Sequence, residues 1–441
     1  MAKLEWNNYL SEKERDRRWK LVRDYMQSKG LDGLLALGGG VWYVDAGRFV
    51  QHQTLDRYLS GWASGTTIVF PLKGEPVLLG VPFDRAIRWT PDTPKEELPW
   101  IEDVRINASA ASIVEAIKDR GLDHSRIAAG NISQVRGASG PERWTSTVWG
   151  TGMVWNQVVK RLPDCKFESL DNDLLMQILV KSEEELAMVR QAAAALEQAM
   201  VAVVKTVRVG ASELDVYKTI INTVLDNGAI PSEPYITSGP ATVAGAELWQ
   251  HGFGSPRIFE PGDVVNCGNC CFAFVGGLEA QSQLTVAIPP VSKENTKCAQ
   301  IARERYEAGL RALQPGRTMR EVSEAMAAPM EKHGAWNMNG TIHSMNPILL
   351  GGGSNEASQR RQVEYYKEYY EKYNQRADGR VPVRNREEEE ATLKPGMVFE
   401  LEPEGCLGRH RVNIGGTVIV TESGNEELNK IGTQMRIAGE I

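Results

Sequence analysis

Long hydrophobic runs and a secretory signal are both missing from this sequence of 441 residues. A membrane-spanning helix needs about 18 consecutive apolar residues, and no uninterrupted stretch here approaches that length. The opening MAKLEWNNYLSEKERDRRWK is charged and has no apolar core of the kind that directs secretion. We therefore expect a cytoplasmic protein with no membrane partner.

Cysteine is scarce, and positive charge is not in excess. Six cysteines do not make a secreted disulfide scaffold at this length, so we expect reduced thiols. The formal net charge of −7 argues against nucleic acid as the main partner. The sequence also lacks a glycine-rich phosphate-binding motif. The ligand class that remains is a small molecule or a peptide.

The composition is that of an ordinary globular protein, with 42% hydrophobic and 24% charged residues. A chain of this length favours two domains, which we place at residues 1–175 and 176–441. In the first, strand-like runs such as DGLLAL and TTIVFPL alternate with helical ones, which is typical of a mixed α/β domain. Most of the tryptophans lie there; they either pack or, as we propose for Trp62, form an aromatic wall for a ligand.

Capping patterns predict the helices that open the second domain. Ser182 and Glu185 begin the amphipathic run SEEELAMVRQAAAALEQAMVAVVKTV, and Ser212 with Asp215 begins a second helix that ends at Gly228. Two more helices are predicted at about 293–313 and 319–332.

Strand patterns and one charged segment complete the second domain. PYITSG, GMVFELEP and NIGGTVIVTESG are strand-like, and VVNCGNCCFAFVGG is interpreted as a hairpin. The segment at about 354–392 is charged, rich in tyrosine and nearly free of aliphatic residues, so it cannot build a core of its own. We interpret it as a solvated insertion, or less simply as a lid over a pocket.

A series of landmarks in the second domain resembles the creatinase/aminopeptidase P family, which has the pita-bread fold. In order they are KSEEELAMVRQAA, VRVGASELDV, SGPAT, EPGDVVN, LQPGRTMREV, GTIHS, LKPGMVFELEP and GTVIVTESGNEEL. The resemblance implies an N-terminal creatinase/prolidase-like domain followed by a pita-bread catalytic domain, and a homodimer. It covers about residues 180–435.

Most members of this family bind two divalent cations through two aspartates, a histidine and two glutamates. Clustered carboxylates are needed there because the charge of two close cations must be neutralised. His343 matches the histidine and Glu402 the first glutamate. The remaining positions fall on Gly268 or Asn269, on Glu279 or Ala280, and on Gly415. Too few acidic ligands remain for a dinuclear site, so we expect no metal cofactor, although three ligands would survive if Glu279 is the aligned residue.

A further resemblance points to the metal-free, creatinase-like members. There the acid/base histidine stands eleven residues before the Gly-Asp turn, and His251 stands eleven residues before Gly262. His343-Ser344 and Glu402 match the same members. The catalytic candidates are therefore His251, His343 and Glu402, where a carboxylate beside an imidazole favours the charged form of each.

The substrate-binding candidates follow Glu279 along the sequence. The second substrate glutamate of the creatinase-like members maps to Gln281 or Ser282, and the arginine after it to Ser282 or Gln283. A neutral AQSQ stretch is poorly suited to a guanidinium cation, so a neutral amide, urea or carbamate is the better substrate. The predicted binding residues are Gln281, Ser282, Glu279 and Trp62.

The leading functional hypothesis is a metal-independent hydrolase of a C–N bond in a small polar molecule. His251 would take a proton from water and return it to the leaving nitrogen. The alternatives are an aminopeptidase P-like metallopeptidase with a modified site, a lyase that uses the same residues, and a non-catalytic binding protein. The CGNCC stretch, Cys267–Cys271, adds a rival thiol or zinc site, against the simpler interpretation of buried cysteines in a strand.

Overall fold

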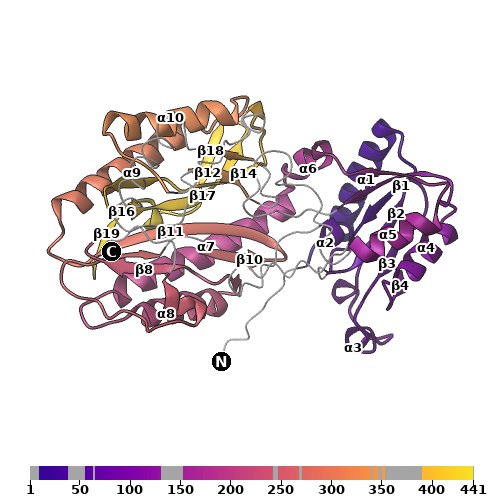
Figure 1. Ribbon diagram of the computed structural model, residues 1–441, viewed down its shortest axis with the longest axis horizontal. Coiled ribbons are helices and arrows are strands. Elements are labelled where there is room, and N and C mark those ends of the chain that lie inside the picture. The colour runs from indigo at the N-terminus through magenta and orange to yellow at the C-terminus, as the bar shows by residue number, and fades with distance from the viewer. Residues whose placement is uncertain are drawn as a thin grey trace, which may run out of the picture. The chain divides into compact units, whose positions relative to one another are not determined.

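The computed structural model describes two compact units, which divide between Ile178 and Leu179 (Figure 1). The described residues are 9–37, 55–62, 65–130, 152–241, 247–267, 271–338, 341–345, 350–352 and 390–440. Most of the predicted charged insertion, at 353–389, lies outside them.

The N-terminal unit is built on a six-stranded mixed sheet with the order β4-β3-β2-β1-β5-β6. β1–β2 and β2–β3 are antiparallel, whereas β1–β5, β3–β4 and β5–β6 are parallel. Its strands are β1 (Gly33–Ala36), β2 (Thr67–Pro71), β3 (Val77–Leu79), β4 (Asp103–Arg105), β5 (Arg126–Gly130) and β6 (Lys166–Ser169). Its helices are α1 (Glu12–Lys29), α2 (Leu55–Ser60), α3 (Phe83–Ala86), α4 (Ala110–Asp119), α5 (Gly152–Arg161) and α6 (Asn172–Ile178).

This unit has the mixed α/β character that its sequence predicts. The strand-like runs DGLLAL and TTIVFPL correspond to β1 and β2, and strands β1, β2 and β3 are buried along their whole length. One face of the sheet packs against α4 and α5 through a core that includes Ile113, Ile117 and Val158. Burial of this apolar surface is the main stabilising term for the unit.

The C-terminal unit has four long helices over an extensively paired sheet. The helices are α7 (Glu183–Thr206), α8 (Glu213–Asp226), α9 (Lys293–Ala312) and α10 (Met319–Lys332). The capping boxes predicted at Ser182–Glu185 and Ser212–Asp215 are confirmed. Each serine hydroxyl accepts a hydrogen bond from the N3 amide, and each N3 carboxylate accepts one from the serine amide. In Figure 1, α9 and α10 lie above the sheet and α8 lies below it.

The main path of the large sheet runs β13-β12-β14-β17-β11-β10-β7. Its strands, with those that branch from it, are β7 (Ile230–Pro231), β8 (Ile236–Gly239), β9 (Val264–Cys267), β10 (Phe272–Val275), β11 (Leu278–Ala287), β12 (Ile342–Ser344), β13 (Gly351–Gly352), β14 (Val398–Leu401), β17 (Gly415–Thr421), β18 (Gly424–Glu427) and β19 (Arg436–Ile437). A separate two-stranded ribbon pairs β15 (Glu404–Leu407) with β16 (His410–Asn413).

The hairpin predicted within VVNCGNCCFAFVGG is not formed as expected. β9 and β10 do not pair with each other, and both run antiparallel to β11. The chain reverses between β10 and β11 at Gly276 and Gly277, which have φ of 58° and 85° that glycine adopts without a Cβ penalty. β11 is buried along all ten of its residues.

Helix α7 packs against strand β11. Among the described helices it is the one long and apolar enough to cross a membrane by length and composition, but 56% of its apolar window is buried inside the unit. It packs against β10 and β11, as the core helix of a folded domain does.

Candidate functional site

His343 and Glu402 face each other at one side of the sheet. β12, which carries His343, pairs with β14, and Glu402 follows β14 directly. His343 Nε2 lies 3.6 Å from Glu402 Oε1, and His343 Nδ1 lies 3.0 Å from the carbonyl oxygen of Ser344. Because a carbonyl oxygen can only accept, Nδ1 carries a proton and Nε2 is directed at the carboxylate. Both side chains keep partial solvent access, 15% for His343 and 12% for Glu402, so the pair sits at the boundary of the core.

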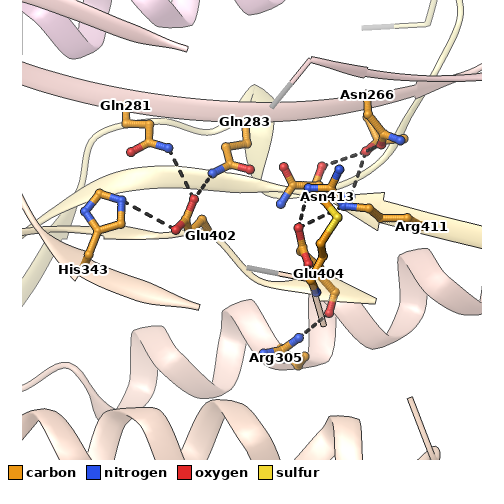
Figure 2. Close-up of polar contacts among 11 residues, drawn as sticks. Asn266, Gln281, Gln283, Arg305, His343, Glu402, Glu404, Arg411 and Asn413 are labelled. Atoms are coloured by element: carbon orange, nitrogen blue, oxygen red, sulfur yellow. Dashed lines mark hydrogen bonds and ion pairs between the residues drawn. The ribbon is translucent and has the colours of Figure 1, made fainter. Parts of the chain in front are cut away.

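Two glutamines of β11 reach the other oxygen of Glu402 (Figure 2). Gln281 Nε2 donates to Glu402 Oε2 at 3.3 Å, and Gln283 Nε2 donates to the same oxygen. The Glu402 amide is held by the carbonyl of Thr341 at 2.9 Å. Burial raises the pKa of the Glu402 carboxyl, and the neighbouring His343 opposes that rise. The hydrogen bond from Gln283 opposes the rise as well, because it favours the charged carboxylate.

A second carboxyl, Glu400, lies deeper on the same strand and pairs in register with Thr417 of β17. It is fully buried, and burial together with the charge of Glu402 raises the pKa of Glu400 well above its usual range, which favours the protonated acid. A Cβ built on Gly415 would come within 2.7 Å of Glu400 Oε1 and of the Leu401 carbonyl oxygen. Glu400 thus fills the space that a side chain at position 415 would need.

A buried network on the far side of Glu402 supports the strands of the site (Figure 2). Arg411 Nε donates to Glu404 Oε1 at 2.9 Å, and the Met338 amide donates to Glu404 Oε2 at 2.7 Å. Thr285 Oγ1 lies 2.6 Å from Asn266 Oδ1 and 2.7 Å from the Asn413 carbonyl oxygen. These contacts tie β9, β11, β15 and β16 together beneath the site.

The residues present do not fit a dinuclear metal centre. In the part of the chain that the structure describes, no three His, Cys, Asp or Glu side chains gather closely enough to hold a metal ion. One oxygen of Glu402 is engaged by two amide donors, and Gly415 has no room for a carboxylate of its own. Hard divalent cations need several oxygen ligands with negative charge, which this arrangement does not supply.

The structure brings three of the predicted site residues together: His343, Glu402 and Gln281. Gln283 joins them, although the sequence-based set of binding residues omitted it. Alternation along β11 was the available signal, because residues two apart share a face of a strand. The same alternation places Ser282 on the opposite face, where its hydroxyl donates to the Gly415 carbonyl at 3.3 Å.

Glu279 and Ala280 are the two residues to which one acidic metal ligand of the family could be mapped. Glu279 is fully buried and pairs in register with Phe274. Alternation along β11 puts it on the face of Gln281 and Gln283, whereas Ala280 lies on the other face.

The structure does not test two other predicted residues. Trp62 belongs to the N-terminal unit. There its ring centroid lies 5.5 Å from that of Trp89, and the Arg85 guanidinium lies over the Trp62 ring. His251 ends a short 3-10 helix, Leu248–His251, and its side chain lies outside the described residues, so its catalytic role stays a prediction.

The rival thiol hypothesis finds little support at Cys267. This cysteine is completely buried at the end of β9, and burial raises the pKa of its thiol far above the ordinary value. A nucleophile or a zinc ligand needs the thiolate, which such an environment disfavours. Residues 268–270, which include Cys270, are not among those described.

Comparison with known proteins decides the family. The model of metallopeptidase family M24 matches residues 187–422, which is more than half of the chain. The chain belongs to metallopeptidase family M24. Membership in family M24 places it among hydrolases that act on C–N bonds, and confirms the predicted relation to the creatinase and aminopeptidase P proteins.

Two known proteins are distantly similar to the chain in sequence. Methionine aminopeptidase of Clostridium acetobutylicum is 23% identical over 253 residues, which cover 56% of this chain and 90% of that protein. Creatinase of Bacillus sp. (strain B-0618) is 21% identical over 291 residues, which cover 62% of this chain and 62% of that protein.

The X-Pro aminopeptidase of Thermotoga maritima has a similar structure, with a TM-score of 0.69 at 18% identity, covering 95% of this chain and 99% of that one. The likeness confirms the predicted fold: an α/β protein with an N-terminal mixed-sheet domain and a C-terminal pita-bread domain. Within family M24 these comparisons favour a metal-dependent peptidase over the metal-free hypothesis, which rests on the site residues alone.

Proposed function

We propose that this family M24 protein hydrolyses a C–N bond in a small polar molecule without a dinuclear metal centre. The observation that carries the proposal is the environment of Glu402, where two glutamine amides and an imidazole occupy the positions around the carboxylate. A carboxylate held in this way can orient a substrate and exchange a proton with His343. It is not free to bridge two cations.

In the proposed reaction, His343 and Glu402 act together as an ion pair beside the substrate. His343 Nε2 points at Glu402 Oε1, so the pair can orient the substrate and stabilise developing charge, while His251 returns to the leaving nitrogen the proton that it takes from water. Glu402 stabilises the imidazolium while the C–N bond breaks. His251 is the proposed base that takes a proton from the attacking water, by its spacing from the Gly-Asp turn.

The second candidate is a metal-dependent peptidase, and the family assignment favours it. Metal analysis of the purified protein separates the two. The metal-free proposal predicts well under one equivalent of manganese, cobalt or zinc, and turnover that survives a chelator; about two equivalents with chelator-sensitive turnover would establish the peptidase instead.

The activity itself is tested by release of amine from a panel of primary amides, ureido compounds and Xaa-Pro dipeptides. His343→Asn and His251→Asn are each expected to reduce turnover by about 100-fold or more, the usual loss for an acid/base group. Gln300→Asn, at an exposed position of α9, is the control and should retain wild-type turnover. Unchanged turnover in both histidine variants would refute the mechanism.

The proposal also includes a homodimer in the cytoplasm, with no resident cofactor and no nucleic-acid or membrane partner. Light scattering of the purified full chain measures the oligomeric state directly. A monomer at micromolar concentration would remove the dimer from the proposal.

A further inference from the structure

The side-chain amides of Gln281 and Gln283 have a defined orientation. Both Nε2 atoms meet the same oxygen of Glu402. A carboxylate oxygen only accepts hydrogen bonds, so the nitrogen of each amide must face Glu402 and the oxygen must face away. The usual ambiguity between amide oxygen and nitrogen is therefore removed at these two residues.

Both amide oxygens are buried without a partner. Gln281 is 2% exposed and Gln283 is fully buried, yet neither Oε1 has a hydrogen-bond donor among the described residues. Figure 2 shows the Gln281 oxygen on the side of His343 and the Gln283 oxygen on the side of Asn413. The two acceptors therefore flank the carboxylate along one face of β11.

An unsatisfied buried acceptor is costly, and native proteins keep few of them. Two such acceptors on neighbouring residues of a candidate site are best explained by a ligand that supplies the missing donors. A ligand without N–H or O–H groups would leave both unsatisfied and would be rejected.

We propose that Gln281 and Gln283 form a subsite for a neutral group with at least two N–H donors, such as a primary amide or a urea. The inference rests on the proposed function, because it concerns the same site. A neutral group fits because the acceptors are uncharged amide oxygens, while Glu402 already faces His343. The subsite binds the substrate and orients its carbonyl carbon; it does not itself transfer a proton.

A matched pair of cyclic ureas tests the subsite on the full-length protein. The probe 2-imidazolidinone has two N–H groups, and 1,3-dimethyl-2-imidazolidinone has the same ring and carbonyl without them. We expect ligand-observed NMR titration to give about tenfold or greater preference for the N–H compound. Equal affinity for the two ureas, or no binding of either up to the solubility limit, would overturn the subsite without any variant being made.

Variants localise the preference. Gln281→Met and Gln283→Met keep the length of the side chain and remove its oxygen, so each should weaken the N–H compound about fivefold or more and leave the dimethyl compound unchanged. Gln300→Met, the same substitution at an exposed position of α9, should bind as wild type does. Retained preference in both Gln281→Met and Gln283→Met would also overturn the proposal, as would tighter binding of guanidinium chloride than of the neutral urea.

Turnover separates this inference from the proposed function. Binding of the ureas does not require hydrolysis, so a protein that prefers N–H compounds but hydrolyses nothing would refute the function and retain the subsite. A protein that hydrolyses C–N bonds with no preference between the two ureas would refute the subsite alone. In His343→Asn, we expect turnover to be lost and the preference between the ureas to remain.

Discussion

Arg305 Nη2 donates a 2.6 Å hydrogen bond to Thr341 Oγ1 and thereby joins helix α9 to the segment that leads into His343. The same guanidinium donates to the carbonyl of Glu404 and, through Nε at 3.0 Å, to the carbonyl of Met326. Thr341 in turn accepts the amide of Glu402. One fully buried side chain therefore connects helix α9 to the residue before β12 and to the start of β15, two residues after Glu402.

Replacing Arg305 by methionine should destabilise the C-terminal unit. The substitution leaves two buried carbonyls and one hydroxyl without their donor, which we expect to lower the free energy of unfolding by about 2–4 kcal/mol. Denaturant unfolding measures the loss. Arg311→Met, at an exposed position of the same helix, should change it by no more than about 0.5 kcal/mol. Equal losses in the two variants would contradict the connecting role of Arg305.

Gly415→Ala should also be destabilising. The new Cβ would meet both Glu400 Oε1 and the carbonyl of Leu401 at 2.7 Å, so the strands must shift, at an expected cost of about 1–3 kcal/mol. Gly351 is the control, because nothing lies within 4 Å of a Cβ placed there. Thermal unfolding of the two alanine variants makes the comparison, and a Gly415→Ala protein as stable as Gly351→Ala would show that the space is not occupied as described.

Asp103 links stability of the N-terminal unit to pH. Hydrogen bonds from Arg105 and Arg120 lower the pKa of Asp103 below its ordinary value. A group whose pKa is depressed by folding stabilises the protein above its unfolded pKa, about 3.9, and loses that contribution as pH falls through the folded value.

Asp103→Asn should therefore lower stability near neutral pH by about 0.5–1 kcal/mol, because the ion pairs are partly exposed. The difference from wild type should shrink steadily below about pH 4. Urea unfolding at several pH values checks both points, with Glu96→Gln at an exposed position as the control. A difference that grows on acidification would contradict the sign.

Cys267, Cys298 and Cys406 should resist alkylation in the folded protein. All three are buried, and burial raises the pKa of the Cys298 thiol to about 12. Iodoacetamide at neutral pH, followed by peptide mass spectrometry, should modify these cysteines only after denaturation. Rapid modification of native Cys267 would restore the thiol hypothesis for this site.

Local features of the fold were predictable from neighbouring residues. The serine caps of α7 and α8 were identified because a cap and its partner are three residues apart, and the four predicted helices agree closely with those observed. The β9–β10 hairpin was wrong because a strand pattern shows that a segment is extended but not which strand it pairs with.

The candidate site was predictable only in part. His343 and Glu402 were identified by the family landmarks, and the structure places them together. Gln283 was one of two positions to which the family arginine could be mapped, and it was left out of the predicted binding residues because the other position, Ser282, was kept. Ser282 was included because sequence alignment left a one-residue choice, and a shift of one residue moves a side chain to the other face of a strand.

By itself, the sequence determined the helices, the runs of buried strand, the family relation and the loss of acidic ligands, since each of these depends on residue type and short spacing. Only the tertiary structure decided which polar groups meet. Gln281 reaches Glu402 across 121 residues of chain because β11, β17 and β14 lie side by side in one sheet. The pairing of these strands also sets the direction of the two glutamine amide oxygens and places Glu400 in the space beside Gly415. Neither feature can be predicted from residues that are neighbours in the sequence.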